Sequence, residues 1–223
     1  MITPENLRTQ VERLTTDLIG CSLCDKQNFP SLREEPSNIK KIDFGQSDIS
    51  IVLKNKPYQE IYNELLRTQA YNLKMLDGAL IQLMYEFHRN SLLRHRLAFF
   101  PSPYLEEFQN NPEIYEEDCI YADIIKKNIV PFPIRFDFDC NEDTVVVVEH
   151  PQSHLTLGQY QNCRIPVSSP LTPFIFIDFI LLNFYNTAYN KYSEKISKYS
   201  EVFMNTIEPS EQKIIHVQLP LQE

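Results

Sequence analysis

Glycine and long apolar runs are both scarce in this chain. Only four of the 223 residues are glycine, which argues against a glycine-rich loop of the kind that cradles phosphates. No window has the roughly 18 apolar residues that a membrane-spanning helix needs. The most apolar run, residues 174–182, is short and is interrupted by Asp178. The N-terminus lacks a basic stretch followed by an apolar one, so we expect no signal peptide.

The rest of the composition is typical of a soluble globular protein, with 43% hydrophobic and 23% charged residues. The cysteine count, five, is odd and favours a reducing compartment over a disulfide framework, so we expect a cytoplasmic protein. Cys21 and Cys24 form a CxxC pair, but no second pair accompanies it. Free thiols are therefore favoured over a zinc site.

The net charge of −9 is concentrated in one segment. Residues 106–149 hold twelve acids and three bases, whereas the remaining acids and bases balance. This argues against nucleic-acid binding by the protein as a whole. Residues 88–96 are a local exception, with three arginines, two histidines and no acid. They suggest either a basic helix end or a phosphate-contacting patch that includes Arg94 and Arg96.

The patterns predict a single α+β domain, residues 1–223, with a mainly antiparallel sheet of about five to seven strands packed against long helices. The centre of this sheet is expected at about residues 130–169. Helices are predicted over residues 4–19, 58–66, 71–87 and about 172–199, and a loop over residues 25–38. Strands are predicted over 39–44 and 49–53 as a hairpin, and over 96–100, 130–139, 144–148, 155–157, 163–167 and 213–219. Residues 104–128 are expected to form a short helix, a loop and a weak helix.

One predicted strand carries alternating charges. Arg135, Asp137 and Asp139 lie at every second position, so their side chains point to the same face. Two carboxylates about 7 Å apart along a strand could bind Mg²⁺ or Mn²⁺ with a third ligand, as phosphoryl-transfer enzymes do. A ladder of ion pairs is the structural alternative.

Two histidines flank a predicted turn after the next strand. His150 and His154 enclose Pro151, Gln152 and Ser153, and histidine suits metal binding or proton transfer near neutral pH. A purely structural role is the alternative. The candidate catalytic residues are thus Asp137, Asp139, His154 and His150, the first two also being candidate metal ligands, and the candidate binding residues are Arg135, Arg164, Arg94 and Arg96.

A further carboxylate, Asp178, lies within an apolar stretch and needs a partner if it is buried. We expect a buried ion pair with Arg135 or Arg164. The stretches 134–139, 153–154 and 175–178 also resemble in part the three motifs of archaeo-eukaryotic primases. They depart from that pattern because Ser153 adjoins His154 instead of lying two residues before it.

A combination of motifs resembles an uncharacterised bacterial family over most of the chain. The motifs are RFDFD at 135–139, HPQSHLTLG at 150–158, CRIP at 163–166 and LTPF at 171–174. The resemblance implies a gene neighbourhood with a superfamily 1 helicase in anti-phage defence loci, and therefore a helicase partner. It brings no established catalytic residues.

Two hypotheses about function follow. The first is a sensor or adaptor subunit without a cofactor, consistent with the acidic segment and the absence of a complete catalytic motif. The second is a metal-dependent nuclease or phosphoryl-transfer subunit that uses Mg²⁺ or Mn²⁺ with Asp137, Asp139 and His154.

Overall fold

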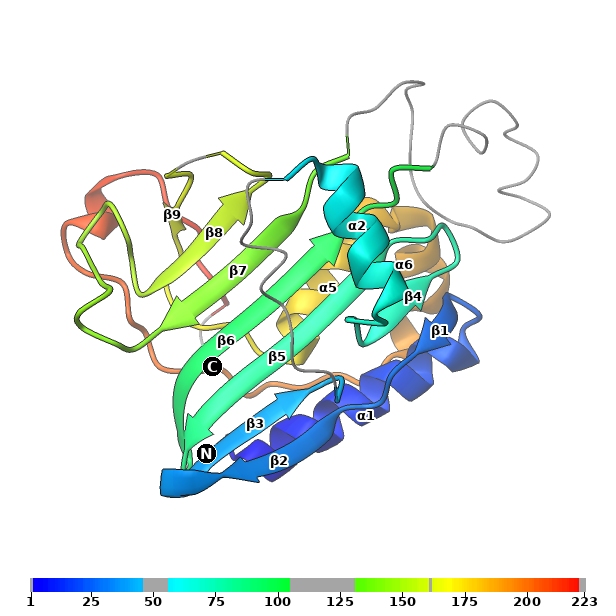
Figure 1. The fold of residues 1–223 in the computed structure, drawn as a ribbon, viewed down its shortest axis with the longest axis horizontal. Helices are drawn as coiled ribbons and strands as arrows, with labels where there is room; N and C mark the ends of the chain where they lie inside the picture. The colour runs from blue at the N-terminus through cyan, green and yellow to red at the C-terminus, as the bar shows by residue number, and fades with distance from the viewer. Residues whose placement is uncertain (1, 46–55, 105–130, 161, 221–223) are drawn as a thin grey trace.

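The computed structural model describes residues 2–45, 56–104, 131–160 and 162–220. Within these ranges the chain forms one open antiparallel sheet of nine strands and four α-helices (Figure 1). The predicted α+β class with an antiparallel sheet is confirmed, although the sheet has more strands than expected. No helix in the described part of the chain combines the length and apolar character needed to cross a membrane.

The strands are β1 (Cys24–Gln27), β2 (Ser31–Glu35), β3 (Ile39–Asp43), β4 (Leu73–Met75), β5 (Leu80–His88), β6 (Ser91–Phe100), β7 (Ile134–Asp139), β8 (Ser153–Leu157) and β9 (Ile165–Pro166). The α-helices are α1 (Pro4–Gly20), α2 (Tyr58–Arg67), α5 (Pro173–Phe184) and α6 (Asn186–Tyr192). Three short 3₁₀ turns are also present within the described residues: Pro36–Asn38 between β2 and β3, and Ser193–Lys195 and Glu211–Lys213 after α6.

The two longest strands, β5 and β6, form the hairpin on which the sheet is built. Beyond β6 the sheet continues through β7 and β8 to β9, and each strand pairs antiparallel with its neighbour. On the other side of β5, β4 pairs with its beginning and β3 with its end. β1 extends β4, and β2 extends β3.

One face of the sheet carries the larger hydrophobic core and is covered by α1, α5 and α6 (Figure 1). α1 begins with Thr3, whose side chain accepts a hydrogen bond from the backbone N–H of Asn6, and with Pro4 in the first turn. The residues of its buried stripe are each at most 2% exposed: Leu7, Val11, Leu14 and Leu18. This stripe has the helical spacing that packing on a sheet requires.

The opposite face is covered only at one end within the described residues. There α2 packs Tyr62 and Leu65 over Leu80, Ala98 and Phe100 in a smaller hydrophobic cluster. Beyond this cluster, the same face of β6, β7 and β8 carries polar and charged side chains. Among the described residues this uneven cover leaves a polar surface on the sheet, and the candidate site lies there.

Two buried ionisable side chains connect the sheet to the α5 region. The hydroxyl of Tyr185 donates to both carboxylate oxygens of Asp77 at 2.9 and 2.8 Å, and burial raises the pKa of Asp77 to about 6. The Nε2 of His95 accepts a hydrogen bond from the backbone N–H of Leu171 at 3.1 Å. Burial lowers the pKa of His95 to about 4.

The prediction of a helix over residues 71–87 is wrong, because this stretch forms β4, a turn and β5. The turn contains Asp77 and Gly78, and Gly78 has φ +87°, which a glycine adopts without strain. β5 is buried on both faces over its first half, and its leucines, Leu80 and Leu83, also match a helical period. Residues 88–96, interpreted as a basic helix end, instead form the β5–β6 turn and most of β6.

The valine run is the second misplaced element. Residues 144–148 form turns, not a strand, and Val146 and Val147 are 51% and 48% exposed. Val148 has φ +73°, which is incompatible with an extended strand. Nothing in the structure explains why four valines occupy this surface.

Other predicted elements differ in extent. Residues 25–38 contain most of β1 and all of β2, although a loop was expected. The strand at 39–44 pairs with β2 and β5, and its expected hairpin partner at 49–53 lies outside the described residues, as do 105–128. The long helix over 172–199 is broken at Tyr185, whose hydroxyl is held by Asp77. The predicted strand 213–219 is not a strand, and to the described residues it makes a single bridge, from Val217 to Val167.

Candidate functional site

The polar side chains of β7 lie on the open face of the sheet. Ile134, Phe136 and Phe138 are at most 7% exposed and point into the core. The alternate positions Arg135, Asp137 and Asp139 therefore project to the opposite side, as the strand period requires. The sequence prediction that these three share a face is confirmed by the burial pattern of the strand.

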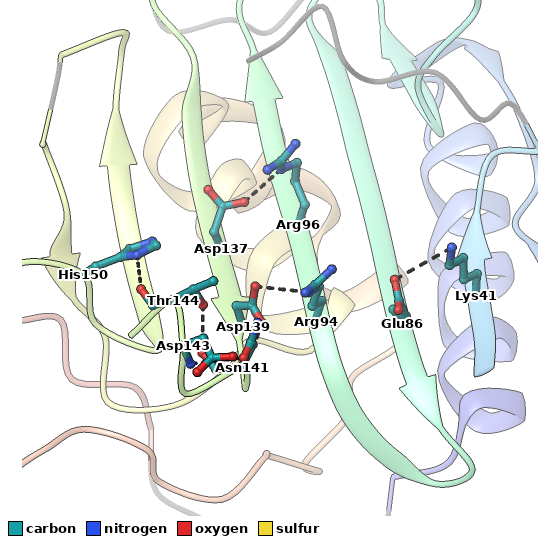
Figure 2. Close-up of polar contacts among 10 residues, drawn as sticks. All are labelled: Lys41, Glu86, Arg94, Arg96, Asp137, Asp139, Asn141, Asp143, Thr144 and His150. Atoms are coloured by element: carbon teal, nitrogen blue, oxygen red, sulfur yellow. Dashed lines mark hydrogen bonds and ion pairs between the residues drawn. The ribbon is translucent and has the colours of Figure 1, made fainter. Parts of the chain in front are cut away.

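Strand register brings further charged residues to the same place. Asp137 lies opposite Arg96 on β6 and opposite His154 on β8. Asp139 lies opposite Arg94. Figure 2 shows both arginines and both aspartates projecting from neighbouring strands toward one another. Residues that are far apart in the sequence thus form one row across three strands.

Asp137 is the carboxylate at the centre of this row. Its Oδ1 accepts a hydrogen bond from the Nε of Arg96 at 2.9 Å, and its Oδ2 lies 3.9 Å from the Nε of Arg135. Burial acts to raise the pKa of Asp137, but the charges of Arg96 and Arg135 outweigh it, so the pKa lies below its ordinary value. Asp137 is therefore an ionised anchor for two guanidinium groups near neutral pH.

Positive charge exceeds negative charge around Asp137. Burial lowers the pKa of Arg135, and the neighbouring charges of Arg96 and Arg164 lower it further, while Asp137 opposes them. The Nε of Arg135 is buried without a hydrogen-bond partner. No carboxylate in the described part of the chain lies within ion-pair distance of Arg164. Asp137 thus pairs with two guanidinium groups, those of Arg96 and Arg135, and the Arg164 guanidinium adds a third positive charge that acts on Arg135.

The two candidate histidines lie side by side at the edge of this cluster. Their ring centroids are 5.1 Å apart. The Nδ1 of His150 lies 2.5 Å from the carbonyl oxygen of Thr144, and the Nδ1 of His154 lies 2.8 Å from that of Pro151. Burial lowers the pKa of His154, although the charge of Asp137 opposes the change. Because its pKa lies below the ordinary value, the His154 ring is neutral near pH 7.

These residues line a cleft of about 790 Å³, a volume within the range of small-molecule sites. Every candidate catalytic or binding residue contributes to its lining: Arg94, Arg96, Arg135, Asp137, Asp139, His150, His154 and Arg164. Four further lining residues were not predicted from the sequence: Lys41, Glu86, Thr144 and Tyr160. Lys41 and Glu86 form a further cross-strand pair, and only the register of β3 and β5 could have placed them (Figure 2).

The carboxylates do not fit a divalent metal ion in this arrangement. Asp137 is engaged by Arg96 and Arg135, and the Oδ2 of Asp139 lies 3.1 Å from the Nε of Arg94. A metal ion at this point would have to compete with guanidinium groups for the same oxygens. Among the described residues, no group of three or more His, Cys, Asp or Glu side chains is arranged to hold a metal.

The prediction that Asp178 forms a buried ion pair with Arg135 or Arg164 is wrong. Asp178 lies on α5, on the covered side of the sheet, and is only partly buried. Burial raises its pKa, opposed by a hydrogen bond from Tyr189 and by the charge of Lys198. Arg135 is on the other face and pairs with Asp137. Asp178 thus cannot complete the primase-like set of carboxylates with Asp137 and Asp139.

One protein family accounts for nearly the whole chain. The family model described as "Uncharacterized conserved protein (DUF2290)" matches residues 23–219. The chain belongs to the DUF2290 family. The matched region includes all nine strands and every residue of the cleft, so the site lies within the part of the chain that defines the family. No curated protein and no solved structure matches the chain.

Proposed function

We propose that the cleft binds the phosphate groups of a single-stranded nucleic acid. The observation that supports this is the cluster of three arginines, Arg96, Arg135 and Arg164, in which Asp137 pairs with the first two and no described carboxylate pairs with the third. A partly desolvated cluster with more cations than anions favours an anionic ligand, and arginine forks match phosphate oxygens well. The whole-chain charge of −9 does not oppose such binding, because contact is made by local charge.

The proposed biological setting is an accessory subunit of an anti-phage defence system that acts with a helicase. This part is supported by the resemblance of the HPQSHLTLG and CRIP stretches described above. A subunit that contacts a nucleic-acid strand would suit a helicase partner, since helicases expose single strands. Co-purification of the two proteins from cells that express both genes tests it, and two separate peaks in size-exclusion chromatography would contradict it.

Arg164 is the residue with which to test phosphate binding. Arg96 and Arg135 hold Asp137, so their removal would leave a buried carboxylate unpaired and would risk unfolding. Arg164 has no ion pair within the described residues, so Arg164→Gln removes one cation from the cleft at little structural cost. Arg67→Gln is the matched control, because Arg67 is an exposed arginine of α2 that does not line the cleft.

The measurement is fluorescence anisotropy of a labelled single-stranded RNA with 2′-O-methyl riboses, in EDTA at several salt concentrations. Three phosphate contacts predict a slope of log K against log salt of about −2, from about 0.7 for each contact on a single strand. Arg164→Gln is expected to weaken binding and to reduce the slope by about 0.7. Absence of binding by the wild type, or equal loss in the Arg67 variant, would refute the proposal.

A further inference from the structure

The two histidines have the same fixed orientation. A carbonyl oxygen only accepts hydrogen bonds, so the Nδ1 of His150 must donate to Thr144 and the Nδ1 of His154 to Pro151. In each neutral ring the proton is then on Nδ1 and the lone pair on Nε2. Within the described residues neither Nε2 has a hydrogen-bond partner.

The backbone keeps both rings at the cleft. His154 is on β8 directly opposite Asp137, and it is 6% exposed. His150 precedes the strand and is tied back to the turn at Thr144 (Figure 2). Both rings line the same cleft as the guanidinium groups. Two imidazoles beside an anion-binding cluster can act as general base and general acid on a phosphodiester.

We propose that His150 and His154 cleave RNA by transphosphorylation without a metal ion. His154 Nε2 removes the proton of a ribose 2′-hydroxyl, and that oxygen forms a bond to the neighbouring phosphorus. The bond from phosphorus to the 5′ oxygen breaks, and protonated His150 gives its Nε2 proton to the leaving oxygen. The products are a 2′,3′-cyclic phosphate and a 5′-hydroxyl end, and the enzyme recovers its protonation state by exchange with water.

The charged neighbours have defined parts in this reaction. The pentacoordinate phosphorus carries more negative charge than the ground state, and Arg96, Arg135 and Arg164 are placed to stabilise it. The titratable and charged groups that interact electrostatically with His154 are Asp137, His150, Arg164 and His95. Asp137 stabilises the imidazolium that forms when His154 accepts the proton, so it is a positioning residue and not the base.

The choice of RNA follows from the nucleophile. The site offers bases and cations, but its carboxylates are held by arginines. A 2′-hydroxyl is an internal nucleophile that needs only a base, whereas DNA has none. The inference rests on the proposed phosphate binding, but cleavage and binding are measured separately, so cleavage can fail while binding stands.

The test uses the full-length protein in excess EDTA with a labelled DNA oligonucleotide that contains one ribonucleotide. A second oligonucleotide carries 2′-O-methyl at that position. The variants are His154→Gln, His150→Gln and, as control, His88→Ala, because His88 is exposed at the end of β5 and does not line the cleft. Thermal melting of each variant verifies folding.

We expect cleavage only at the ribonucleotide and a cyclic phosphate on the upstream product. Loss of a general acid or base is expected to reduce the rate by about 10²-fold or more in each glutamine variant, whereas His88→Ala retains the wild-type rate. His150 is only partly buried, so its variant keeps the test decisive if His154→Gln does not fold.

Four outcomes would overturn the inference. Wild-type protein that binds the anisotropy probe but does not cleave the oligonucleotide with the ribonucleotide refutes cleavage and leaves the proposed binding intact. Absence of binding refutes both proposals. Cleavage that requires added Mg²⁺ or Mn²⁺ favours a metal-dependent nuclease instead. Equal cleavage by the wild type and both glutamine variants points to a contaminating ribonuclease.

Discussion

The buried pair of Asp77 and Tyr185 predicts an unusual dependence of stability on pH. The folded pKa of Asp77 is about 6, whereas an unfolded aspartate titrates near 3.9. Between these values only the folded state holds the proton, so the free energy of unfolding falls as pH rises. Two pKa units correspond to about 3 kcal/mol, present below pH 4 and lost by about pH 6 to 7.

His95 has the opposite effect over nearly the same range. Its folded pKa is about 4, below the value of about 6.5 for an unfolded histidine. Between these values only the unfolded state is protonated, so the free energy of unfolding rises with pH, again by about 3 kcal/mol. From pH 4 to 6 the contributions of Asp77 and His95 therefore nearly cancel in the wild type.

Single substitutions should reveal each contribution. Asp77→Asn can still accept from Tyr185 and Ala79 but no longer titrates, so its stability relative to the wild type should increase by about 3 kcal/mol from pH 4 to 7. His95→Gln retains an acceptor for Leu171, and its relative stability should decrease over pH 4 to 6.5. Urea unfolding at half-unit pH intervals measures both. Variant curves that run parallel to the wild type would refute the argument.

Two further predictions concern the core and a helix end. Phe176 is fully buried against Phe136, so Phe176→Ala should lower the free energy of unfolding by about 3–5 kcal/mol. The control Ile215→Ala, at a site 90% exposed, should change it by less than about 0.5 kcal/mol. Similar midpoints of urea unfolding for the two variants would contradict this. Thr172 caps α5 by accepting from the N–H of Ile175, so Thr172→Ala should cost about 0.5–2 kcal/mol while Thr172→Ser retains most of it, and equal losses in both variants would argue against the cap.

The elements that the sequence predicted are those with a local cause. Thr3 and Pro4 begin α1, and its leucine spacing repeats over several turns. The alternation from Ile134 to Asp139 predicts β7, because one face of that strand is core and the other is polar. In both cases the burial that shapes the element has the same period as the element itself.

In the elements that the sequence did not predict, the pattern of apolar residues does not follow the two-residue period of a strand. The beginning of β5 lies between α2 on one face and the main core on the other, so its apolar residues do not alternate. The turn at Asp77 and Gly78 was the only local signal against a helix there. The prediction for residues 144–148 was wrong for the opposite reason. Their apolar side chains predicted a buried strand, but the chain forms exposed turns there.

All eight candidate residues named from the sequence line the cleft, but the sequence explains the position of only some of them. Arg135, Asp137 and Asp139 follow from the alternation on β7. Arg94 and Arg96 were candidates as part of a phosphate-contacting patch, with a basic helix end as the alternative, and they reach the cleft as residues of β6. Their pairing with Asp139 and Asp137 depends on strand register across about 40 residues, which no local pattern encodes.

Asp137 explains how the cations of the cleft can be held close together before a ligand binds. Without it, Arg96, Arg135 and Arg164 would repel one another in a partly buried place. One carboxylate between two of them offsets that repulsion, yet it leaves the third cation and the buried Nε of Arg135 unpaired. A bound phosphate would supply the missing acceptor oxygens. In the proposed phosphate site an aspartate would strengthen anion binding by organising the arginines, so the charge of single residues, or of the whole chain, would be a poor guide to its ligand.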